Sequence, residues 1–393
     1  MEKIKIIAFY LPQFYPVEIK DNLYGKGFTE WRNVARAKKL FPTHYQPHIP
    51  ADLGFYDLRV PETRKAQADL AKKYDIYGFC YWHYWLGNGL EFLEKPVQEI
   101  MKLGEPDFPF CLAWANHNWT SNSYLAKNGK ILIHQEYPGE EDYKKHFYSV
   151  LPCLKDDRYI KIDGKPVFMI YQPTAHKDIP LFIKIWRELA QKEGLKGIYF
   201  IGHLNNDLKG VTKEAVLKTG VDAVNTEFIT SWFAHHRNMI MRILGKIGRT
   251  IFHVPHRISY RRAEKYFLSD IDREENVFPS VIPNWDNTPR RNTNGVVLTG
   301  STPKLFAQHF RKALEMVKSK PENRQYIFLK SWNEWAEGNY VEPDLKFGTA
   351  YLEVIKDELN KITRGGYRCI VNCTARYNYD GFYVCASSKE VAA

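Results

Sequence analysis

Two glutamates with the spacing of a catalytic pair stand late in the chain. Glu334 and Glu337 lie three residues apart in the segment Ser-Trp-Asn-Glu-Trp-Ala-Glu-Gly, 331–338. Cleavage of a glycosidic bond usually uses one protonated and one ionised carboxyl group, and two neighbouring carboxylates raise the pKa of one of them. If the loop turns after a strand, both side chains can face one cleft. We expect this pair to be catalytic; the alternative is a capped or ion-paired loop.

Eight short apolar runs, rich in β-branched and aromatic residues, predict the strands that would position this pair. Such runs are typical of strands buried on both faces. Eight strands alternating with helices indicate an α/β fold, a (β/α)8 TIM barrel. The chain has 393 residues, 44% of them apolar, which is ample for one large core. The predicted strands are Lys5–Tyr10, Tyr77–Trp82, Pro109–Trp114, Pro166–Tyr171, Gly197–Gly202, Ala223–Thr226, Phe278–Pro283 and Tyr326–Lys330.

Segments with helical spacing lie between these strands. A doubly wound open sheet is the competing architecture, and it would place a glycine-rich turn after an early strand. The first strand instead runs into Leu-Pro-Gln-Phe-Tyr-Pro, which favours the barrel. The predicted helices are Pro61–Lys73, Glu141–Lys155, Ile179–Lys192, Thr212–Thr219 and Pro303–Lys318.

Two long stretches and a tail interrupt the alternation. Residues from 11 to about 55 follow the first strand, and residues from 227 to about 276 follow the sixth. In a barrel, both would sit at the C-terminal ends of strands, where active-site loops belong. We predict one catalytic barrel over residues 1–363 with these two insertions, and a small hairpin-like tail over residues 364–393.

Aromatic, amide, imidazole and acidic residues recur where the predicted strands end. Flat aromatic rings stack on the apolar faces of sugars, while amides and imidazoles bond hydroxyl groups. We therefore expect a sugar cleft at this end of the barrel, with an oligo- or polysaccharide substrate. Glu227 and Asp286 are reserve candidates for the acid pair. The residues predicted to bind substrate are Tyr10, Trp31, Trp82, His83, Trp114, Asn116, Trp119, His203, Glu227, Trp285, Asp286, Trp332, Asn333 and Trp335.

Metal binding is a weaker interpretation of the same residues. His83, His117 and His203, completed by Glu227 or Asp286, could ligate a metal, but they lack a recognisable ligand spacing. A cysteine cluster near the C-terminus, at positions 369, 373 and 385, also lacks the spacing of a zinc site. We expect neither a metal nor another cofactor.

The formal charge of +11 is unevenly distributed. No Asp or Glu occurs from Phe228 to Ala263, and we expect the basic segment 235–262 to contact an anionic glycan, a lipid-linked carrier or a membrane surface. The alternative is a solvated helical insertion. No nucleic-acid motif accompanies the charge, so nucleic acid is not an expected partner. Without a leader or a long apolar run, we expect a cytoplasmic protein, peripheral to the inner membrane if the basic segment binds lipid.

Several of these segments together resemble the signature of the WbsX-type proteins, which are related to glycoside hydrolase family 99. Such proteins are often encoded with bacterial surface-polysaccharide genes. The resemblance runs from the first strand to about residue 350 and does not cover the basic segment or the tail. The segments that carry it are Ala8–Phe14, Gly27–Trp31, Gln46–His48, Gly78–Trp85, Trp114–Trp119 and Trp332–Gly338, followed by Tyr340 and Glu342–Asp344.

This resemblance implies a barrel related to the endo-α-mannosidases of family 99, in which a Glu-Trp-His-Glu-Gly segment supplies both catalytic carboxylates. Glu334 and Glu337 occupy the matching places, and Ala336 stands where the mannosidases carry His. The implied mechanism is retaining. Glu334 would act as base on the sugar 2-hydroxyl, giving a 1,2-anhydro intermediate, and Glu337 would act as acid and then as base toward water.

The leading hypothesis is therefore a retaining, metal-independent, endo-acting glycoside hydrolase of a bacterial surface polysaccharide or its precursor. Two alternatives use the same cleft for lipopolysaccharide (O-antigen) or capsule biosynthesis: a glycosyltransferase, and a transglycosylase in which a sugar hydroxyl replaces water. A glycosyltransferase would need a diphosphate site, and the sequence has no glycine-rich phosphate loop. A glycan-binding protein without catalysis is the third alternative.

Overall fold

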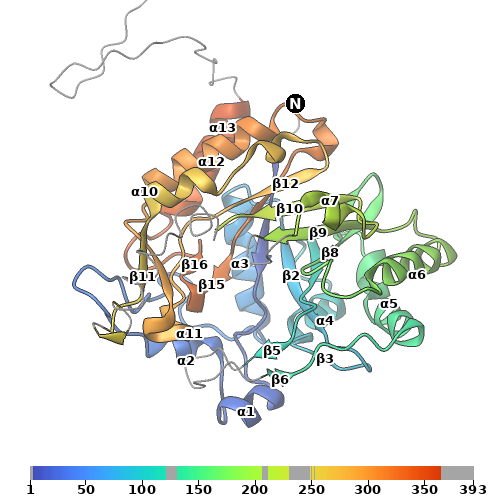
Figure 1. Cartoon of the computed structure of the whole chain (residues 1–393), viewed down its shortest axis with the longest axis horizontal. Helices are drawn as coiled ribbons and strands as arrows, with labels where there is room; N and C mark the ends of the chain where they lie inside the picture. Colours follow the sequence, from blue (N-terminus) through green and yellow to red (C-terminus); the bar gives the residue numbers. More distant parts are fainter. Residues whose placement is uncertain are drawn as a thin grey trace, which may run out of the picture.

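The computed structural model describes residues 3–120, 131–205, 211–229, 248, 250–251 and 253–363. In this part of the chain, eight parallel strands form a closed barrel (Figure 1). The first strand pairs with the last on one side and with the second on the other, which closes the sheet. The predicted (β/α)8 barrel is confirmed. Its strands are β1 (Lys5–Tyr10), β2 (Gly78–Trp85), β4 (Phe110–Trp114), β8 (Lys165–Ile170), β9 (Tyr199–Asn205), β10 (Ala223–Glu227), β12 (Val277–Val281) and β14 (Tyr326–Leu329).

The barrel strands coincide with the eight apolar runs because nearly all of their residues are buried. Strand β2 is longer than predicted and continues to Trp85. Its extension is stabilised by the short strand β3 (Glu91–Phe92), which pairs antiparallel with Tyr84 and Trp85. This hairpin carries β2 beyond the barrel rim, toward the loops that follow the strands.

The five predicted helices are also confirmed, to within a few residues at their ends. Thr212 and Thr302 mark two N-termini, where each hydroxyl accepts a hydrogen bond from a backbone N–H of the first turn. Helices α5 and α6 pack together on one side of the barrel, and α12 and α13 on another (Figure 1). The helices between or after barrel strands are α3 (Pro61–Lys73), α4 (Lys95–Leu103), α5 (Glu140–Lys155), α6 (Ile179–Lys192), α7 (Lys213–Leu217), α12 (Pro303–Val317) and α13 (Ala350–Thr363).

Three loops at the C-terminal ends of the strands carry short elements of their own. The loop after β1 contains α1 (Glu18–Tyr24) and α2 (Glu30–Ala35), and the loop after β12 contains α11 (Thr288–Arg291). Beyond β14 come β15 (Asn333–Glu334), the 3-10 helix η5 (Trp335–Glu337) and β16 (Asn339–Tyr340). Helices α2 and α11 both contact η5, so segments far apart in the chain meet here.

The remaining described elements are short and lie in the loops of the barrel. Parallel pairing joins β11, which lies within the second insertion, to β13 in the loop after β12. They are β5 (Trp119–Thr120), β6 (Ile131–Ile133), β7 (Lys161–Ile162), β11 (His256–Ser259), β13 (Val296–Thr299), α10 (Tyr260–Ala263), and the 3-10 helices η1 (Glu264–Tyr266), η2 (Asp270–Arg273), η3 (Asn292–Asn294) and η4 (Glu322–Arg324).

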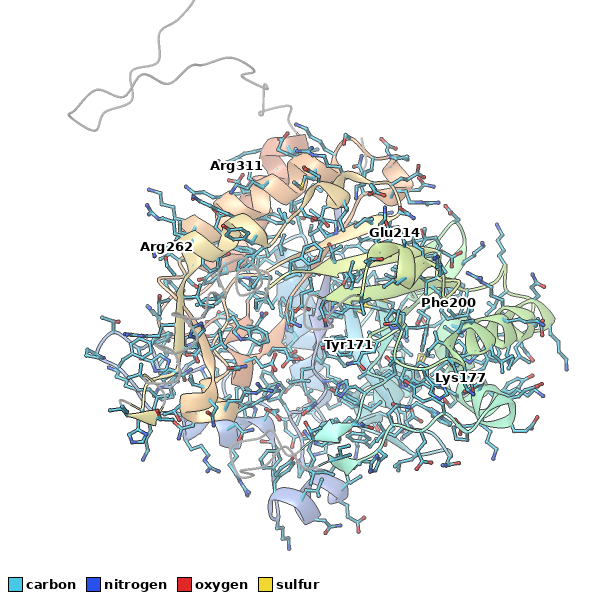
Figure 2. All side chains as sticks on the ribbon, viewed as in Figure 1. Tyr171, Lys177, Phe200, Glu214, Arg262 and Arg311 are labelled. Atoms are coloured by element: carbon cyan, nitrogen blue, oxygen red, sulfur yellow. The ribbon has the colours of Figure 1, made fainter. Side chains whose placement is uncertain are left out.

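Apolar side chains fill the space between barrel and helices, whereas charged residues such as Arg262 and Arg311 lie toward the edge of the molecule (Figure 2). Cys80 and Cys111 are fully buried in strands, as expected of thiols that act as small core residues. No helix in the described ranges has the length and hydropathy needed to span a bilayer. The tail 364–393 and most of the basic segment 235–262 lie outside the described residues, and the proposed domain boundaries stay a prediction.

Candidate active site

A cavity of about 340 Å³ lies among the loops that follow the barrel strands. Its lining comes from segments after β1, β4, β8, β12 and β14 and from the end of β2. This is the end of a (β/α)8 barrel at which active sites form, and the volume is within the range of small-molecule sites. The structure therefore places a candidate ligand site where the strand-end residues predicted one.

Glu334 and Glu337 both line this cavity. Glu334 ends the short strand β15, and the single 3-10 turn of η5 places Glu337 at its own end. Gly338 then adopts a left-handed conformation with φ of +58°, which turns the chain away into β16. The turn brings the two carboxyl groups to one wall, with side-chain exposures of 9% for Glu334 and 20% for Glu337.

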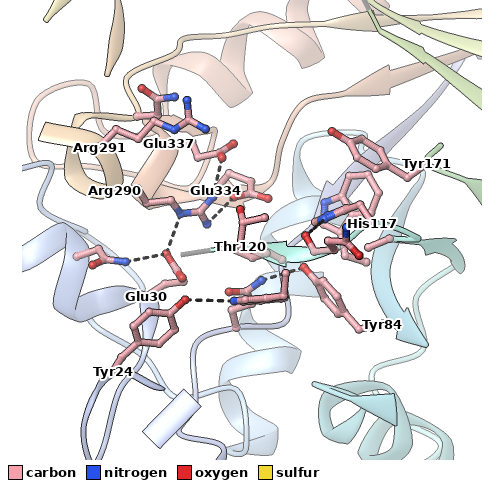
Figure 3. Close-up of a pocket in the computed structure, with 18 of the residues that line it drawn as sticks. Tyr24, Glu30, Tyr84, His117, Thr120, Tyr171, Arg290, Arg291, Glu334 and Glu337 are labelled. Atoms are coloured by element: carbon pink, nitrogen blue, oxygen red, sulfur yellow. Dashed lines mark hydrogen bonds and ion pairs between the residues drawn. The ribbon is translucent and has the colours of Figure 1, made fainter. Parts of the chain in front are cut away.

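One guanidinium group, that of Arg290 in α11, joins these two carboxylates to a third (Figure 3). Its Nη1 lies 2.6 Å from Glu337 Oε1, and its Nη2 lies 3.3 Å from Glu334 Oε2. Its Nε donates to Glu30 Oε2 of α2 at 3.1 Å. The three carboxylates raise the pKa of Arg290, although burial opposes the shift. Arg290 is therefore a permanent cation at the centre of three acidic side chains.

A buried lysine supports Glu30 from the opposite side. Lys20 Nζ lies 3.8 Å from Glu30 Oε1 and contacts Gln13 Oε1. The Lys20 side chain is only 1% exposed, and its burial lowers the pKa of the ammonium group to about 8. Gln13 in turn donates to the hydroxyl of Tyr84, which lines the cavity. A chain of alternating charges thus leads from Lys20 through Glu30 and Arg290 to the candidate catalytic pair.

Burial acts upward on the pKa of two carboxyl groups in this chain, but their net shifts are opposite. Burial, followed by the charge of Glu337, raises the pKa of Glu334 to about 8, against the opposing effect of Arg290. For Glu30, burial also acts upward, but Arg290 and Lys20 together hold the pKa below its usual value. Near neutral pH, Glu334 therefore retains a proton more readily than Glu30, which is held as a carboxylate by its two cations.

A second buried ion pair forms part of another wall. Lys330, at the end of β14, donates from Nζ to Glu227 Oε2 at 2.6 Å. His203 Nε2 lies 3.3 Å from the same carboxylate, and its Nδ1 lies 2.7 Å from Asn225 Oδ1. Burial opposes ionisation of Glu227, yet the Lys330 charge lowers its pKa to about 2. The Glu227 carboxylate is therefore already paired with the ammonium group of Lys330.

Aromatic rings complete the lining. Trp82 stacks on Phe9 at 5.0 Å and meets the ring of Tyr171 at 5.3 Å, with Tyr171 also in the cavity wall. The indole N–H of Trp119 donates to the hydroxyl of Tyr24 at 3.2 Å. These rings present apolar faces close to hydroxyl groups, which is the combination that sugar rings require.

The loop after β12 forms a hydrogen bond with the turn that contains Glu337. The backbone N–H of Asp286 donates to the carbonyl of Glu337 at 2.6 Å. The Asp286 carboxylate receives hydrogen bonds from Gln46 at 2.8 Å and from the Thr288 hydroxyl at 2.6 Å, and it lies 2.7 Å from His44 Nε2. These contacts lower the pKa of Asp286 against the effect of burial. In the structure, its side chain therefore holds loops together.

Within the described residues, four of the predicted site residues line the cavity: Trp82, Trp119, Glu334 and Glu337. The other twelve lie behind or beside it, and all but the partly buried Trp285 are buried. Several hold the cavity loops, as Asn333 does by bonding both main-chain groups of Leu11 at 2.7 and 3.1 Å. These twelve residues are Tyr10, Trp31, His83, Trp114, Asn116, His203, Glu227, Trp285, Asp286, Trp332, Asn333 and Trp335.

The cavity lining also includes residues that were not among the predicted site residues. Glu30 belongs to the segment Gly27–Trp31 that carried the family resemblance, which was an available signal. Arg290 lies in the loop after the seventh barrel strand, and this position also indicated a possible site residue. Lys330 and Tyr171 end predicted strands but lack the pattern of a catalytic pair.

The histidines considered as metal ligands have separate environments. His83 Nε2 lies 2.8 Å from His146 Nε2, and burial lowers the pKa of His83 to about 3. His203 bonds Asn225, whereas His117 lines the cavity. Across the described ranges, no group of three or more His, Cys, Asp or Glu side chains is placed to hold a metal ion. Metal independence stays a prediction.

Comparison with known proteins identifies sequence relatives over most of the chain. A family model described as "Glycosyltransferase WbsX" matches residues 6–355. The proteins called "Uncharacterized protein WxcX" from two strains of Xanthomonas campestris pv. campestris are 29% identical over 360 residues. That alignment covers 91% of this chain and 50% of each relative, so the chain spans about half the length of the curated relatives it matches.

Solved structures share the fold at low sequence identity. A "Glycoside hydrolase-like protein" superposes with a TM-score of 0.57 and 17% identity, covering 91% of this chain and 94% of its own. The GH99 endo-alpha-mannosidase from Bacteroides thetaiotaomicron gives a TM-score of 0.53 at 16% identity, with coverages of 93% and 99%. At these identities the likeness establishes the barrel architecture.

Proposed function

Because the chain belongs to the WbsX family, we propose that it is a carbohydrate-active enzyme, a retaining, endo-acting glycoside hydrolase of a bacterial surface polysaccharide or its precursor. The observation that carries the proposal is the pair Glu334 and Glu337, which faces one cavity and shares the guanidinium of Arg290. Barrel position, aromatic lining and paired carboxyl groups all suit cleavage of a glycosidic bond.

The proposed mechanism uses two carboxyl groups in two steps. Glu334 removes the proton of the sugar 2-hydroxyl as that oxygen attacks C1, while Glu337 protonates the departing glycosidic oxygen. Water then attacks C1 of the anhydro sugar, its proton passes to Glu337, and Glu334 returns a proton to the 2-oxygen. Both carboxyl groups recover their starting states, and two inversions at C1 give overall retention.

The charges of the cavity support an uncharged sugar near the pair. Arg290 already contacts three carboxylates, and Lys330 already pairs with Glu227. A diphosphate would have to compete with these carboxylates for Arg290 and Lys330, because both are held at hydrogen-bond distance, which leaves the exposed Arg291 as the remaining cation of the described lining. This favours glycan cleavage over transfer from a sugar nucleotide.

Glycosyl transfer is the second candidate, because the family description names a glycosyltransferase. The chain contains one Asp-x-Asp sequence, Asp270-Ile-Asp272, which could suggest a metal–diphosphate site. Asp272, however, is fully buried and forms a capping box with Ser269 while accepting a hydrogen bond from Thr226. The protein itself therefore already supplies hydrogen-bond partners to the Asp272 carboxylate. A transglycosylase, in which a sugar hydroxyl intercepts the anhydro sugar, would use the same two glutamates.

The test is to incubate the protein with the surface polysaccharide of its host, with and without sugar nucleotides and with and without chelator. We expect shortened glycan without any nucleotide, unchanged by chelator, with the anomeric configuration retained by NMR. Product only in the presence of a nucleotide donor would establish the transferase instead. Longer glycans from mixed oligosaccharides without a nucleotide would identify the transglycosylase.

Site variants separate catalysis from glycan binding. Glu334→Gln and Glu337→Gln should each lower turnover by about 10²-fold or more, because a general acid or base contributes on this scale. Glu188→Gln, an exposed residue on α6, is the matched control and should keep full activity. Glycan retention with full function in both active-site variants would support a binding protein without catalysis.

The further partners of the chain are also proposals. We infer that the basic segment 235–262 contacts an anionic glycan, a lipid-linked carrier or a membrane surface, and that the protein acts in the cytoplasm at the inner membrane. Of its cations, Arg257 lies 5.1 Å from the ring of Phe41 and is exposed. Binding to anionic but not to neutral vesicles would support the membrane surface.

A further inference from the structure

The charged groups around the candidate catalytic pair do not balance when all are ionised. Lys20 and Arg290 supply two positive charges, whereas Glu30, Glu334 and Glu337 supply three negative charges. Burying an uncompensated charge is costly, and a carboxyl group takes up a proton to avoid it. One proton on this group of five side chains makes it neutral.

Two other cations line the same cavity, Lys330 and Arg291. Arg291 is exposed, so solvent screens its charge. Lys330 faces Glu334 from the end of β14, but its own partner Glu227 at 2.6 Å compensates it. Tyr84 of β2 faces the pair as a neutral hydroxyl, because burial raises its pKa far above neutrality. The need for one bound proton therefore arises from the five side chains themselves, which are Lys20, Glu30, Arg290, Glu334 and Glu337.

Geometry distinguishes the two carboxyl groups that could hold this proton. Arg290 Nη1 lies 2.6 Å from Glu337, but Nη2 lies 3.3 Å from Glu334. Glu337 is also the more exposed side chain, at 20% against 9%. Both the shorter contact and the better hydration favour the charge on Glu337 and the proton on Glu334. Burial, which raises the pKa of Glu334 to about 8, acts in the same direction.

We propose that the negative charge of Glu30 keeps one proton on the Glu334–Glu337 pair, and that Arg290 is the positioning residue that places this proton on Glu334, by its closer contact with Glu337, while the cavity holds no sugar. The catalytic role of this proton rests on the proposed function. In that mechanism Glu334 begins as the base, so the proton must leave its oxygen and reach a Glu337 oxygen as the sugar binds. The transfer needs no proton from solvent, and in the sugar-free structure Arg290 contacts both groups.

A substitution of Glu30 can test this placement of the proton while leaving Glu334 and Glu337 unchanged. Glu30→Gln removes one negative charge, so the two cations are then balanced by Glu334 and Glu337 both ionised. We expect the pKa of Glu334 to fall by about 1 unit, the lower end of the effect of a nearby charge, because Glu30 acts on Glu334 across Arg290. Glu30→Asp keeps the charge and should keep the high value. Glu264→Gln, which removes another buried carboxylate that is paired with Lys312 at 2.9 Å, is the matched control and should change nothing at Glu334.

The readout is a carbon-13 NMR titration of glutamate carboxyl groups in the whole protein, with the two resonances assigned by their loss in Glu334→Gln and Glu337→Gln. Thermal unfolding of each variant checks that the fold is intact. A protonated Glu337 beside an ionised Glu334 at pH 7 would overturn the proposal. So would an unchanged Glu334 titration in folded Glu30→Gln.

This titration needs no substrate, so it fails or succeeds independently of the proposed hydrolase activity. If the protein does cleave glycan, the alkaline limb of its pH–rate profile supplies a second readout. We expect that limb to move to lower pH in Glu30→Gln and to be restored in Glu30→Asp. A merely structural role of Glu30 would lower the rate without moving the limb.

Discussion

The backbone N–H of Asp286 donates a 2.6 Å hydrogen bond to the carbonyl oxygen of Glu337. This contact joins the loop after the seventh barrel strand to the turn after the eighth. Arg290 lies four residues beyond Asp286 in that first loop, so the cation and the carboxylate that it binds are tied to one another through the main chain as well as through their side chains. The geometry of the pair therefore depends on how closely these two loops approach.

Gly338 is the residue that permits this approach, and its substitution should disturb it. A Cβ atom there would lie 2.8 Å from Asp286 Cβ and 2.9 Å from its backbone nitrogen, at a φ of +58°. We expect Gly338→Ala to cost about 3 kcal/mol of unfolding free energy, from strain and overpacking together, and to abolish most activity. Urea denaturation and glycan turnover measure both effects.

The control is Gly348→Ala, because Gly348 also has a positive φ, of +50°, but its Cβ would meet no atom within 4 Å. It should lose only about 1–2 kcal/mol, the cost of the left-handed backbone, and remain active. Equal losses in the two variants would mean that the close approach to Asp286 does not matter.

Glu334→Gln should make the protein more stable at alkaline pH while inactivating it. Since the native pKa of Glu334 is raised to about 8 from 4.5, the native state binds the extra proton between these values. Stability attributable to this group therefore falls as the pH rises from 4.5 to 8, and a neutral glutamine does not share that loss. We expect the variant to exceed wild type by about 2–4 kcal/mol at pH 8 and by much less at pH 5. Urea unfolding at the two pH values checks this, and parallel curves for both proteins would contradict it.

The Glu227–Lys330 pair should govern acid stability. The pKa of Glu227 is lowered to about 2 from 4.5, so its contribution is complete above pH 4.5 and is lost as the pH falls through 2. Glu227→Gln leaves the Lys330 ammonium buried without a counterion, and we expect a loss of about 3–5 kcal/mol at pH 7. The double variant Glu227→Leu, Lys330→Met should recover much of this loss. An acid unfolding curve for Glu227→Gln as steep as that of wild type would show that other groups govern it.

Two tryptophans that follow or end the third barrel strand should behave differently. Trp119 is half-buried in the cavity wall, and we expect Trp119→Ala to weaken glycan binding by about 1 kcal/mol or more with little loss of stability. Trp114 is buried and donates from its indole to the Trp85 carbonyl at 2.8 Å. Its replacement by Ala should cost about 3–5 kcal/mol of stability. Calorimetric titration with oligosaccharide and thermal unfolding separate the two effects.

Much of the barrel was predictable because each strand is buried on both faces. The run Lys5–Tyr10 predicts β1 over the same residues, and Pro61–Lys73 predicts α3. The end of β2 was missed, since its last residues are held by pairing with β3 and not by an apolar pattern of their own.

The position of the candidate glutamates was also predictable, but their electrostatic setting was not. Glu30 and Arg290 are separated by 260 residues, and nothing local in either segment indicates a contact. That contact exists only because the barrel brings the loops after its first and seventh strands beside the turn after its eighth. Long-range charge pairing of this kind follows from closure of the sheet.

Closure of the sheet also sets the order in which the protein acquires its chemistry during synthesis. The first strand is synthesised before its second partner, β14, and the two glutamates beyond β14 are among the last described parts of the barrel to be made. Until then Glu30 has no Arg290 to bind, and neither carboxyl of the pair exists. The activity that we propose toward glycans therefore requires the complete ring of strands.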